Sequence, residues 1–127
     1  MLKYVYSNTL KGDNFMTPYT KEVIRIITSI PAGKIMTYGQ VAKLAGSPRS
    51  ARQVVRILHS MSDKYNLPWH RVINSKGELG IPDQEGYTMQ RFILLSEGVE
   101  VSEKGSIDLK KFQYSPYDYI EIGVQDN

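Results

Sequence analysis

Apolar side chains recur at helical spacing near the start of the chain. The apolar positions between residues 19 and 30 lie three or four apart: Tyr19, Val23, Ile26, Ile27 and Ile30. Thr17 is suited to cap a helix, Pro18 suits its first turn, and the Pro31-Ala32-Gly33 sequence stops it. The pattern therefore predicts a core helix over residues 18–30.

Two shorter helices with a tight turn between them are predicted next. Thr37 begins a capping box, with glutamine three residues later, so we expect a helix over residues 38–45. Ser47 and Pro48 fit the cap and the first position of another helix, which runs to about Met61. Two helices joined by a short glycine-containing turn form a helix-turn-helix.

The pattern changes after residue 66. An apolar stretch over residues 67–73 is followed by Asn74-Ser75-Lys76-Gly77, which has the composition of a turn, so we expect a wing-like hairpin there. A last helix ending at Glu97-Gly98 is indicated by four apolar residues: Met89, Phe92, Ile93 and Leu95. Three residues of the following segment are expected to pack on the domain: Ile107, Leu109 and Phe112.

These elements predict a mainly α fold, a winged helix-turn-helix-like DNA-binding domain with a short hairpin as its wing. A chain of 127 residues has the size of one domain. We divide it into an N-terminal extension over residues 1–16, the domain over 17–112 and a C-terminal tail over 113–127. No signal peptide and no membrane helix are visible, so we expect an intracellular protein, cytoplasmic or nucleoid-associated if prokaryotic, and a monomer.

Charge is distributed unevenly along the chain. Residues 17–80 contain ten Lys and Arg against three Asp and Glu, whereas residues 81–127 contain four against nine. Positive charge concentrated in one half of a small domain favours a polyanionic partner, because neutralising phosphates releases counterions. DNA is therefore the expected partner.

Cysteine is absent from the sequence, which excludes disulfides, thiolate metal ligands and thiol nucleophiles together. The chain has two histidines, His59 and His70, so a zinc site is not expected. We expect neither a metal nor a cofactor.

Three stretches resemble one family. They are Thr37-Tyr38-Gly39-Gln40-Val41-Ala42, Ser50-Ala51-Arg52-Gln53-Val54-Val55 and Pro68-Trp69-His70-Arg71-Val72. Together with residues 94–99 they are similar to the C-terminal domain of O6-alkylguanine-DNA alkyltransferases, and the resemblance covers roughly residues 17–101.

The resemblance implies that this chain is not an enzyme. The family signature is Pro-Cys-His-Arg-Val, in which cysteine accepts the alkyl group, whereas Trp69 takes that position here. The lone pair of an indole nitrogen is delocalised, so tryptophan cannot be the nucleophile. Such a replacement is typical of the alkyltransferase-like group, which binds the lesion without alkyl transfer.

Roles for individual residues follow from the same resemblance. The helix after residue 47 would enter the minor groove, and Arg52 would fill the stack from which a nucleotide has been flipped. The residues implied to contact DNA are Tyr38, Ser50, Ala51, Arg52, Gln53 and Ser75. Those implied to form the lesion pocket are Tyr38, Leu58, Trp69, His70 and Val72. His70 and Glu97 match the pair that activates the cysteine in the repair enzymes, and Met61 takes the place of the family's asparagine hinge.

The implied function is recognition of O6-alkylguanine in double-stranded DNA, followed by recruitment of nucleotide-excision repair proteins. One alternative is an alkyltransferase with another acceptor, such as His70 or a tyrosine. A second alternative is a winged helix-turn-helix regulator that reads an unmodified operator in the major groove, which needs base-reading polar side chains along residues 48–56 and a dimer.

Overall fold

The first core helix forms as predicted. In the computed structural model, which describes residues 16–116, α2 (Pro18–Thr28) begins after Thr17, whose side chain accepts a hydrogen bond from Thr20 N at 3.1 Å. Its inner face is buried, with Val23 and Ile27 fully inaccessible to solvent. The helix ends two residues earlier than predicted, and Ile30 is still buried in the loop that follows.

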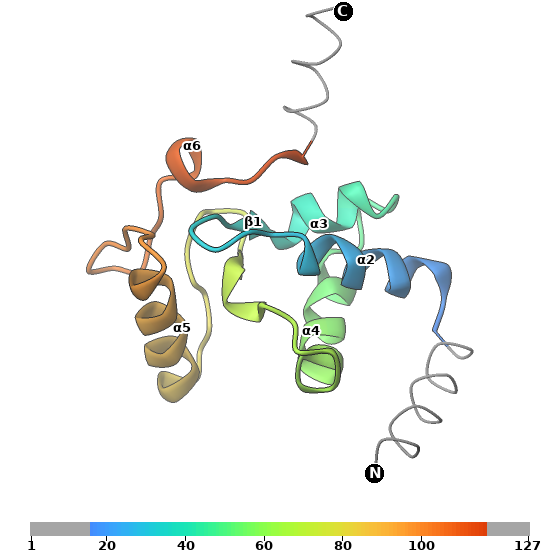
Figure 1. The fold of residues 1–127 in the computed structure, drawn as a ribbon, viewed down its shortest axis with the longest axis horizontal. Helices are drawn as coiled ribbons and strands as arrows, with labels where there is room; N and C mark the ends of the chain where they lie inside the picture. The colour runs from blue at the N-terminus through green and yellow to red at the C-terminus, as the bar shows by residue number, and fades with distance from the viewer. Residues whose placement is uncertain (1–15, 117–127) are drawn as a thin grey trace, which may run out of the picture.

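The helix-turn-helix consists of α3 (Tyr38–Leu44) and α4 (Ala51–Tyr65), and α3 packs against both α2 and α4. The predicted capping box is confirmed: Gln40 N donates to the Thr37 hydroxyl at 3.1 Å, and Thr37 N donates to Gln40 Oε1 at 3.3 Å. Gly46 in the turn has a φ of +98°, a conformation that favours glycine. In Figure 1 these three helices occupy one side of the molecule.

The predicted bounds of the second helix of this motif are wrong at both ends. Ser47 does not cap it, because Ser47 N donates to Ala42 O at 2.9 Å and so completes the end of α3. Ser50 is the residue before α4 instead. At the other end α4 continues past Met61 to Tyr65, and its C-cap Asn66 takes the left-handed conformation with φ 51° that asparagine tolerates.

The predicted hairpin is replaced by a different pairing. β1 (Met36–Thr37) and β2 (Val72–Ile73) form a parallel pair, in the register Met36 to Val72. The chain does turn after β2, and Asn74 N donates to Glu78 O at 3.1 Å. However, the returning segment pairs with a later one, since Glu78 bridges to Ser106, and within residues 16–116 no two-stranded hairpin forms.

The second half of the described chain contains α5 (Gln84–Ser96) and α6 (Leu109–Phe112), and a single 3-10 turn, η1 (Trp69–Arg71), precedes β2. The last predicted helix is confirmed in α5, but its apolar residues do not form the buried face. Met89, Phe92 and Leu95 are 53%, 69% and 47% exposed, whereas Gln90 and Leu94 are fully buried.

Two hydrophobic clusters meet at the β1–β2 pair, which lies between α5 and the helices α2, α3 and α4 (Figure 1). The first cluster joins α2, α3 and α4. The second contains the residues predicted to pack from the C-terminal segment, Ile107 and Phe112, with Leu109 against them. Ile35 connects the two ends of the fold, because Ile35 N donates to Phe112 O at 2.9 Å. Most elements are helices, as predicted. No helix between residues 16 and 116 is long and apolar enough to cross a membrane.

Candidate nucleic-acid interface

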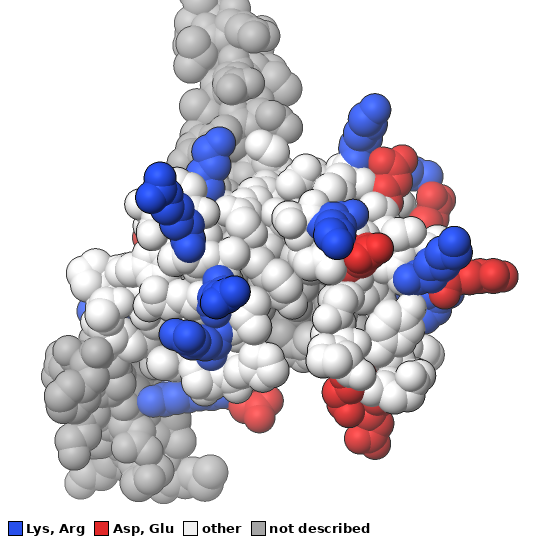
Figure 2. Space-filling view, turned by 180° about the vertical axis from the view of Figure 1, so that it is seen from behind, with Lys and Arg blue, Asp and Glu red and all other residues white. Residues whose placement is uncertain are grey.

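Exposed cations gather on the helix-turn-helix. Arg52 and Arg56 on α4, Arg49 in the preceding turn and Lys43 on α3 are all exposed. None of the four forms an ion pair with another residue of the 16–116 segment. Figure 2 shows Lys and Arg gathered on the half of the molecule that contains α2, α3 and α4, while Asp and Glu are more frequent on the half that contains α5.

The N-terminal end of α4 has the features of a phosphate contact. Ala51 is its first residue, and the next two, Arg52 and Gln53, are exposed. The Ser50 side chain makes no capping hydrogen bond, so it does not satisfy the N–H groups of the first turn. A helix N-terminus with free N–H groups and a neighbouring arginine favours an anion.

Two of the predicted DNA contacts, Ser50 and Ser75, are placed differently from the exposed residues at the start of α4. The Ser50 hydroxyl donates to Ser47 O at 2.8 Å and also contacts the Tyr19 hydroxyl, so its hydrogen is already used. Ser75 is exposed in the 74–77 turn, which is tied to the C-terminal segment because Ile107 N donates to Gly77 O at 2.8 Å. These two residues remain predictions.

A cavity of about 550 Å³ opens beside α4. The structure brings three of the predicted pocket residues into its wall: Tyr38, Leu58 and Trp69. The opposite wall is the 80–83 segment, which leads into α5. Its volume falls within the roughly 300–1,000 Å³ that is usual for small-molecule sites.

His70 and Val72, the other two predicted pocket residues, are not part of this wall. Val72 is fully buried in the first cluster, and its carbonyl accepts a hydrogen bond from Gln90 Nε2 at 3.4 Å. The same Gln90 nitrogen donates to the carbonyl of His70 at 3.1 Å. Gln90 therefore fixes the η1–β2 backbone against α5.

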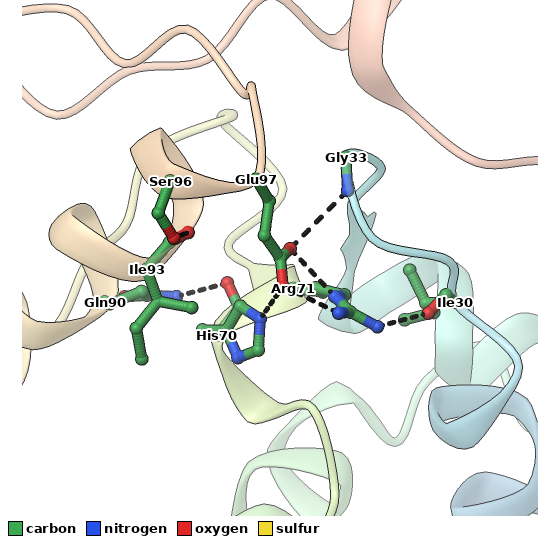
Figure 3. Close-up of polar contacts among 8 residues, drawn as sticks. All are labelled: Ile30, Gly33, His70, Arg71, Gln90, Ile93, Ser96 and Glu97. Carbon is green, nitrogen blue, oxygen red and sulfur yellow. Dashed lines mark hydrogen bonds and ion pairs between the residues drawn. The ribbon is translucent and has the colours of Figure 1, made fainter.

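His70, Arg71 and Glu97 form a polar cluster (Figure 3), and Trp69, the residue before His70, lines the cavity. Arg71 donates two hydrogen bonds to the Glu97 carboxylate, from Nε to Oε1 at 3.0 Å and from Nη2 to Oε2 at 2.6 Å. Its Nη1 donates to Ile30 O at 2.8 Å. His70 Nε2 lies 2.9 Å from the same carboxylate. The predicted His70–Glu97 contact is thus present, but Arg71, which the sequence did not single out, makes more contacts with the carboxylate.

This cluster sets the charge state of Glu97. Hydrogen bonds from Arg71, and then from His70, lower the pKa of the Glu97 carboxyl from 4.5 to about 2, although burial opposes the change. The carboxylate therefore stays ionised and joins the end of α5 to η1. Because η1 carries Trp69, the cluster holds that side chain at the cavity.

Tyr38 presents a hydroxyl to the cavity. Burial raises the pKa of this phenol above its ordinary 10, so the group is protonated and can donate a hydrogen bond at neutral pH. The hydroxyl of Ser62, also in the wall, is buried and has no hydrogen-bond partner within residues 16–116. Of the two groups, the Tyr38 phenol is the candidate donor to a polar ligand, because the Ser62 oxygen is inaccessible to solvent.

The sequence analysis missed nine wall residues: Val55, His59, Ser62, Asp63, Gly80, Ile81, Pro82, Asp83 and Gly86. His59 and Asp63 follow Val55 and Leu58 at helical spacing, a signal that could have found them once the helix was extended beyond Met61. No sequence pattern points to the 80–83 segment, since its position depends on the tertiary fold. No group of three metal-ligating side chains gathers in the part of the chain described.

The protein matches known sequences over most of the domain. Residues 18–99 match the family model described as 6-O-methylguanine DNA methyltransferase, DNA binding domain. The chain is 46% identical over 99 residues to the DNA base-flipping protein of Escherichia coli K12. This alignment covers 76% of this chain and 74% of the relative. It is 36% identical over 103 residues to alkyltransferase-like protein 1 of Schizosaccharomyces pombe, covering 77% and 94%.

Solved structures agree with these matches. S. pombe Atl1, in complex with damaged DNA containing O6-carboxymethylguanine, superposes with a TM-score of 0.72 at 33% identity, over 80% of this chain and 98% of Atl1. The O6-methylguanine methyltransferase of Mycobacterium tuberculosis gives 0.52 at 25% identity, over 76% of this chain and 55% of the enzyme. Fold and site therefore define a DNA-binding domain of the alkyltransferase type. The chain belongs to the 6-O-methylguanine DNA methyltransferase DNA-binding domain family.

Proposed function

We propose that this protein recognises O6-alkylguanine in double-stranded DNA without removing the alkyl group. The observation that carries the proposal is the position of the cavity, which opens beside the exposed basic helix α4 and has Tyr38 and Trp69 in its wall. The names of the E. coli and S. pombe relatives, a base-flipping protein and an alkyltransferase-like protein, support it.

Recognition requires the modified base to leave the duplex, because the stacked neighbours hide its edge. Extrusion costs a few kcal/mol and is easier for a base that pairs weakly, as an O6-alkylguanine does. Arg52, which is exposed at the start of α4 and forms no ion pair with the residues that the structure describes, fills the vacated stack. Ala51 beside it is small enough to allow close approach of the backbone, while Gln53 and the helix N-terminus contact phosphates.

The flipped base then occupies the cavity. Trp69 offers an aromatic surface to the base or its alkyl group, and Leu58 adds an apolar wall. The hydroxyl of Tyr38 supplies a hydrogen bond to a polar atom of the base. His70 and Val72 do not line the cavity. Their hydrogen bonds, from His70 to Glu97 and from Gln90 to Val72 O, hold the η1–β2 backbone in position.

Alkyl transfer is absent in this proposal because Trp69 stands where the family signature has its acceptor cysteine. The sequence has no cysteine, and an indole offers no activated lone pair. His70 is engaged with Glu97, whose carboxylate is held in turn by Arg71. The site therefore binds the lesion and leaves it chemically unchanged.

The biological role we propose is that of a lesion sensor in an intracellular, monomeric protein, whose DNA complex recruits nucleotide-excision repair proteins. The DNA-binding unit is residues 17–112, with residues 1–16 and 113–127 as extensions. Tyr114 N donates to Ile35 O at 2.8 Å, so the start of the C-terminal extension is attached to the domain.

Titration with matched duplexes tests the proposal. Trp69 is the single tryptophan, so its fluorescence reports on the cavity directly. We expect tighter binding and a larger fluorescence change with a duplex containing O6-methylguanine than with the same duplex containing guanine. Equal affinity for both would refute lesion recognition and favour a regulator of unmodified DNA. A methyl group added to the protein mass after incubation would instead indicate an alkyltransferase with another acceptor.

A further inference from the structure

Among the described residues, the wall of the cavity contains two carboxylates and one basic side chain, that of His59. The carboxylates are Asp63 from α4 and Asp83 from the start of α5, and none of the lining residues is Lys or Arg. Neither aspartate forms an ion pair within residues 16–116. The basic residues of α4 that face outward, Arg52 and Arg56, are not part of the wall.

The two carboxylates stand at different places around the cavity. Asp63 lies one helical turn beyond His59 on α4, and Asp83 belongs to the 80–83 segment on the opposite side. The other lining residues include the apolar side chains of Leu58, Trp69 and Ile81. A substituent on a base in this cavity would therefore meet apolar surface and acidic groups.

The partial positive charge at the N-terminus of α5 does not offset the negative charge of the cavity wall. A helix N-terminus is equivalent to roughly half a positive charge. Here Asp83 is the N-cap of α5, and its carboxylate accepts a hydrogen bond from Gly86 N at 2.8 Å. The end of the helix is thus already occupied by a full negative charge, and Asp63 adds a second one.

From this arrangement we propose that the cavity selects O6-alkyl groups by charge, accepting neutral alkyl groups and disfavouring anionic ones. The inference rests on the proposed function and adds a substrate class to it. An O6-carboxymethyl group, whose carboxylate is ionised at neutral pH, is repelled by Asp63 and Asp83. S. pombe Atl1 has been solved with DNA containing O6-carboxymethylguanine, so this adduct is a suitable probe of the cavity.

A pair of adducts of nearly equal shape isolates charge from size. O6-carboxymethylguanine and its amide, O6-carbamoylmethylguanine, differ in one ionisable group. In otherwise identical duplexes at low salt and pH 8, where histidines are ordinarily neutral, we expect the amide to bind about fivefold to thirtyfold more tightly. Because both aspartates are exposed, the ratio should shrink as salt is added.

Substitutions of the two aspartates test whether they cause the preference for the amide adduct. Asp83→Asn keeps a good helix cap, and Asp63→Asn keeps the side-chain shape, so both proteins should fold. Each should lower the ratio between the two adducts, and the double variant should bring it close to one. The matched control is Glu103→Gln, which removes an exposed carboxylate outside the cavity wall and should leave the ratio unchanged.

The outcomes separate the two proposals. If neither adduct binds better than guanine, lesion recognition itself is wrong. Charge selection alone is refuted if both adducts bind better than guanine but equally well, or if Glu103→Gln lowers the ratio as much as the cavity variants do. The proposal stands if the amide is preferred and the asparagine variants abolish that preference.

Discussion

Glu97→Gln tests the role of the polar cluster of His70, Arg71 and Glu97. The fall in the Glu97 pKa from 4.5 to about 2 corresponds to about 3 kcal/mol of stability carried by the ionised carboxylate. The side chain is 15% exposed, so solvent screens it little. We expect the variant to lose about 2–3 kcal/mol in free energy of unfolding at pH 7, measured by urea denaturation.

The loss of stability in Glu97→Gln should also depend on pH, in a direction that follows from the Glu97 pKa. Because the pKa of Glu97 is lower in the folded protein than in the unfolded chain, its contribution is complete above about pH 4.5 and disappears as the pH falls through about 2. At pH 3 the difference between the wild type and Glu97→Gln should therefore have fallen to about half or less of its value at pH 7.

Glu100→Gln is the matched control for this variant. Glu100 also pairs with a cation, Lys111, at 2.9 Å, but the two side chains are 71% and 55% exposed. Exposed ion pairs contribute about 0–1 kcal/mol, so this variant should be nearly neutral at both pH values. Equal losses in the two glutamine variants, or a Glu97→Gln loss that does not change with pH, would refute the reasoning.

Three further predictions concern DNA binding and the core. Arg52→Ala should weaken binding to a duplex with O6-methylguanine far more than Lys43→Ala in an electrophoretic shift assay, since in our proposal only Arg52 replaces the flipped base; comparable losses would indicate simple electrostatics. Tyr38→Phe should cost about 0.5–1.5 kcal/mol of binding through the lost hydroxyl, and Tyr38→Ala more, because the cavity wall is also lost; equal effects would rule out a packing role. On α5, Leu94→Ala should lower the free energy of unfolding by about 2–5 kcal/mol because Leu94 is fully buried, whereas Phe92→Ala, at a 69% exposed position, should change it by less than about 0.5 kcal/mol; similar values would contradict the assignment of the buried face.

Local patterns were sufficient for the helices of the first half. The apolar spacing of α2, the Thr37 capping box and the glycine of the turn act over a few residues, so the sequence alone predicts them. The end of α4 was harder to predict. Its last turn is polar, so the apolar spacing fades before the helix ends at Tyr65, where Asn66 and Pro68 are the stop signals. This turn remains helical because Met61 and Tyr65 pack against the first cluster.

Pairings between distant segments were decided by the tertiary structure. The 72–79 segment has the composition of a hairpin, yet β2 pairs with β1 and Glu78 with Ser106, because those partners satisfy the backbone while burying Ile73 and Leu79. On α5 the apolar residues predicted a helix but not its inner face. Gln90 is buried there because its amide satisfies two carbonyls of the η1–β2 backbone.

The sequence by itself determined the family, the absence of a cysteine nucleophile and the identity of Arg52, Tyr38 and Trp69 as binding residues to test. These conclusions rest on residue types at fixed spacing, which survive any uncertainty in the fold. Only the tertiary structure decided that Arg71 and His70 both contact the Glu97 carboxylate, and that Asp63 and Asp83 line the same cavity. The physical reason is that these contacts join segments about 20 or more residues apart, and the packing of α5 against η1 brings them together.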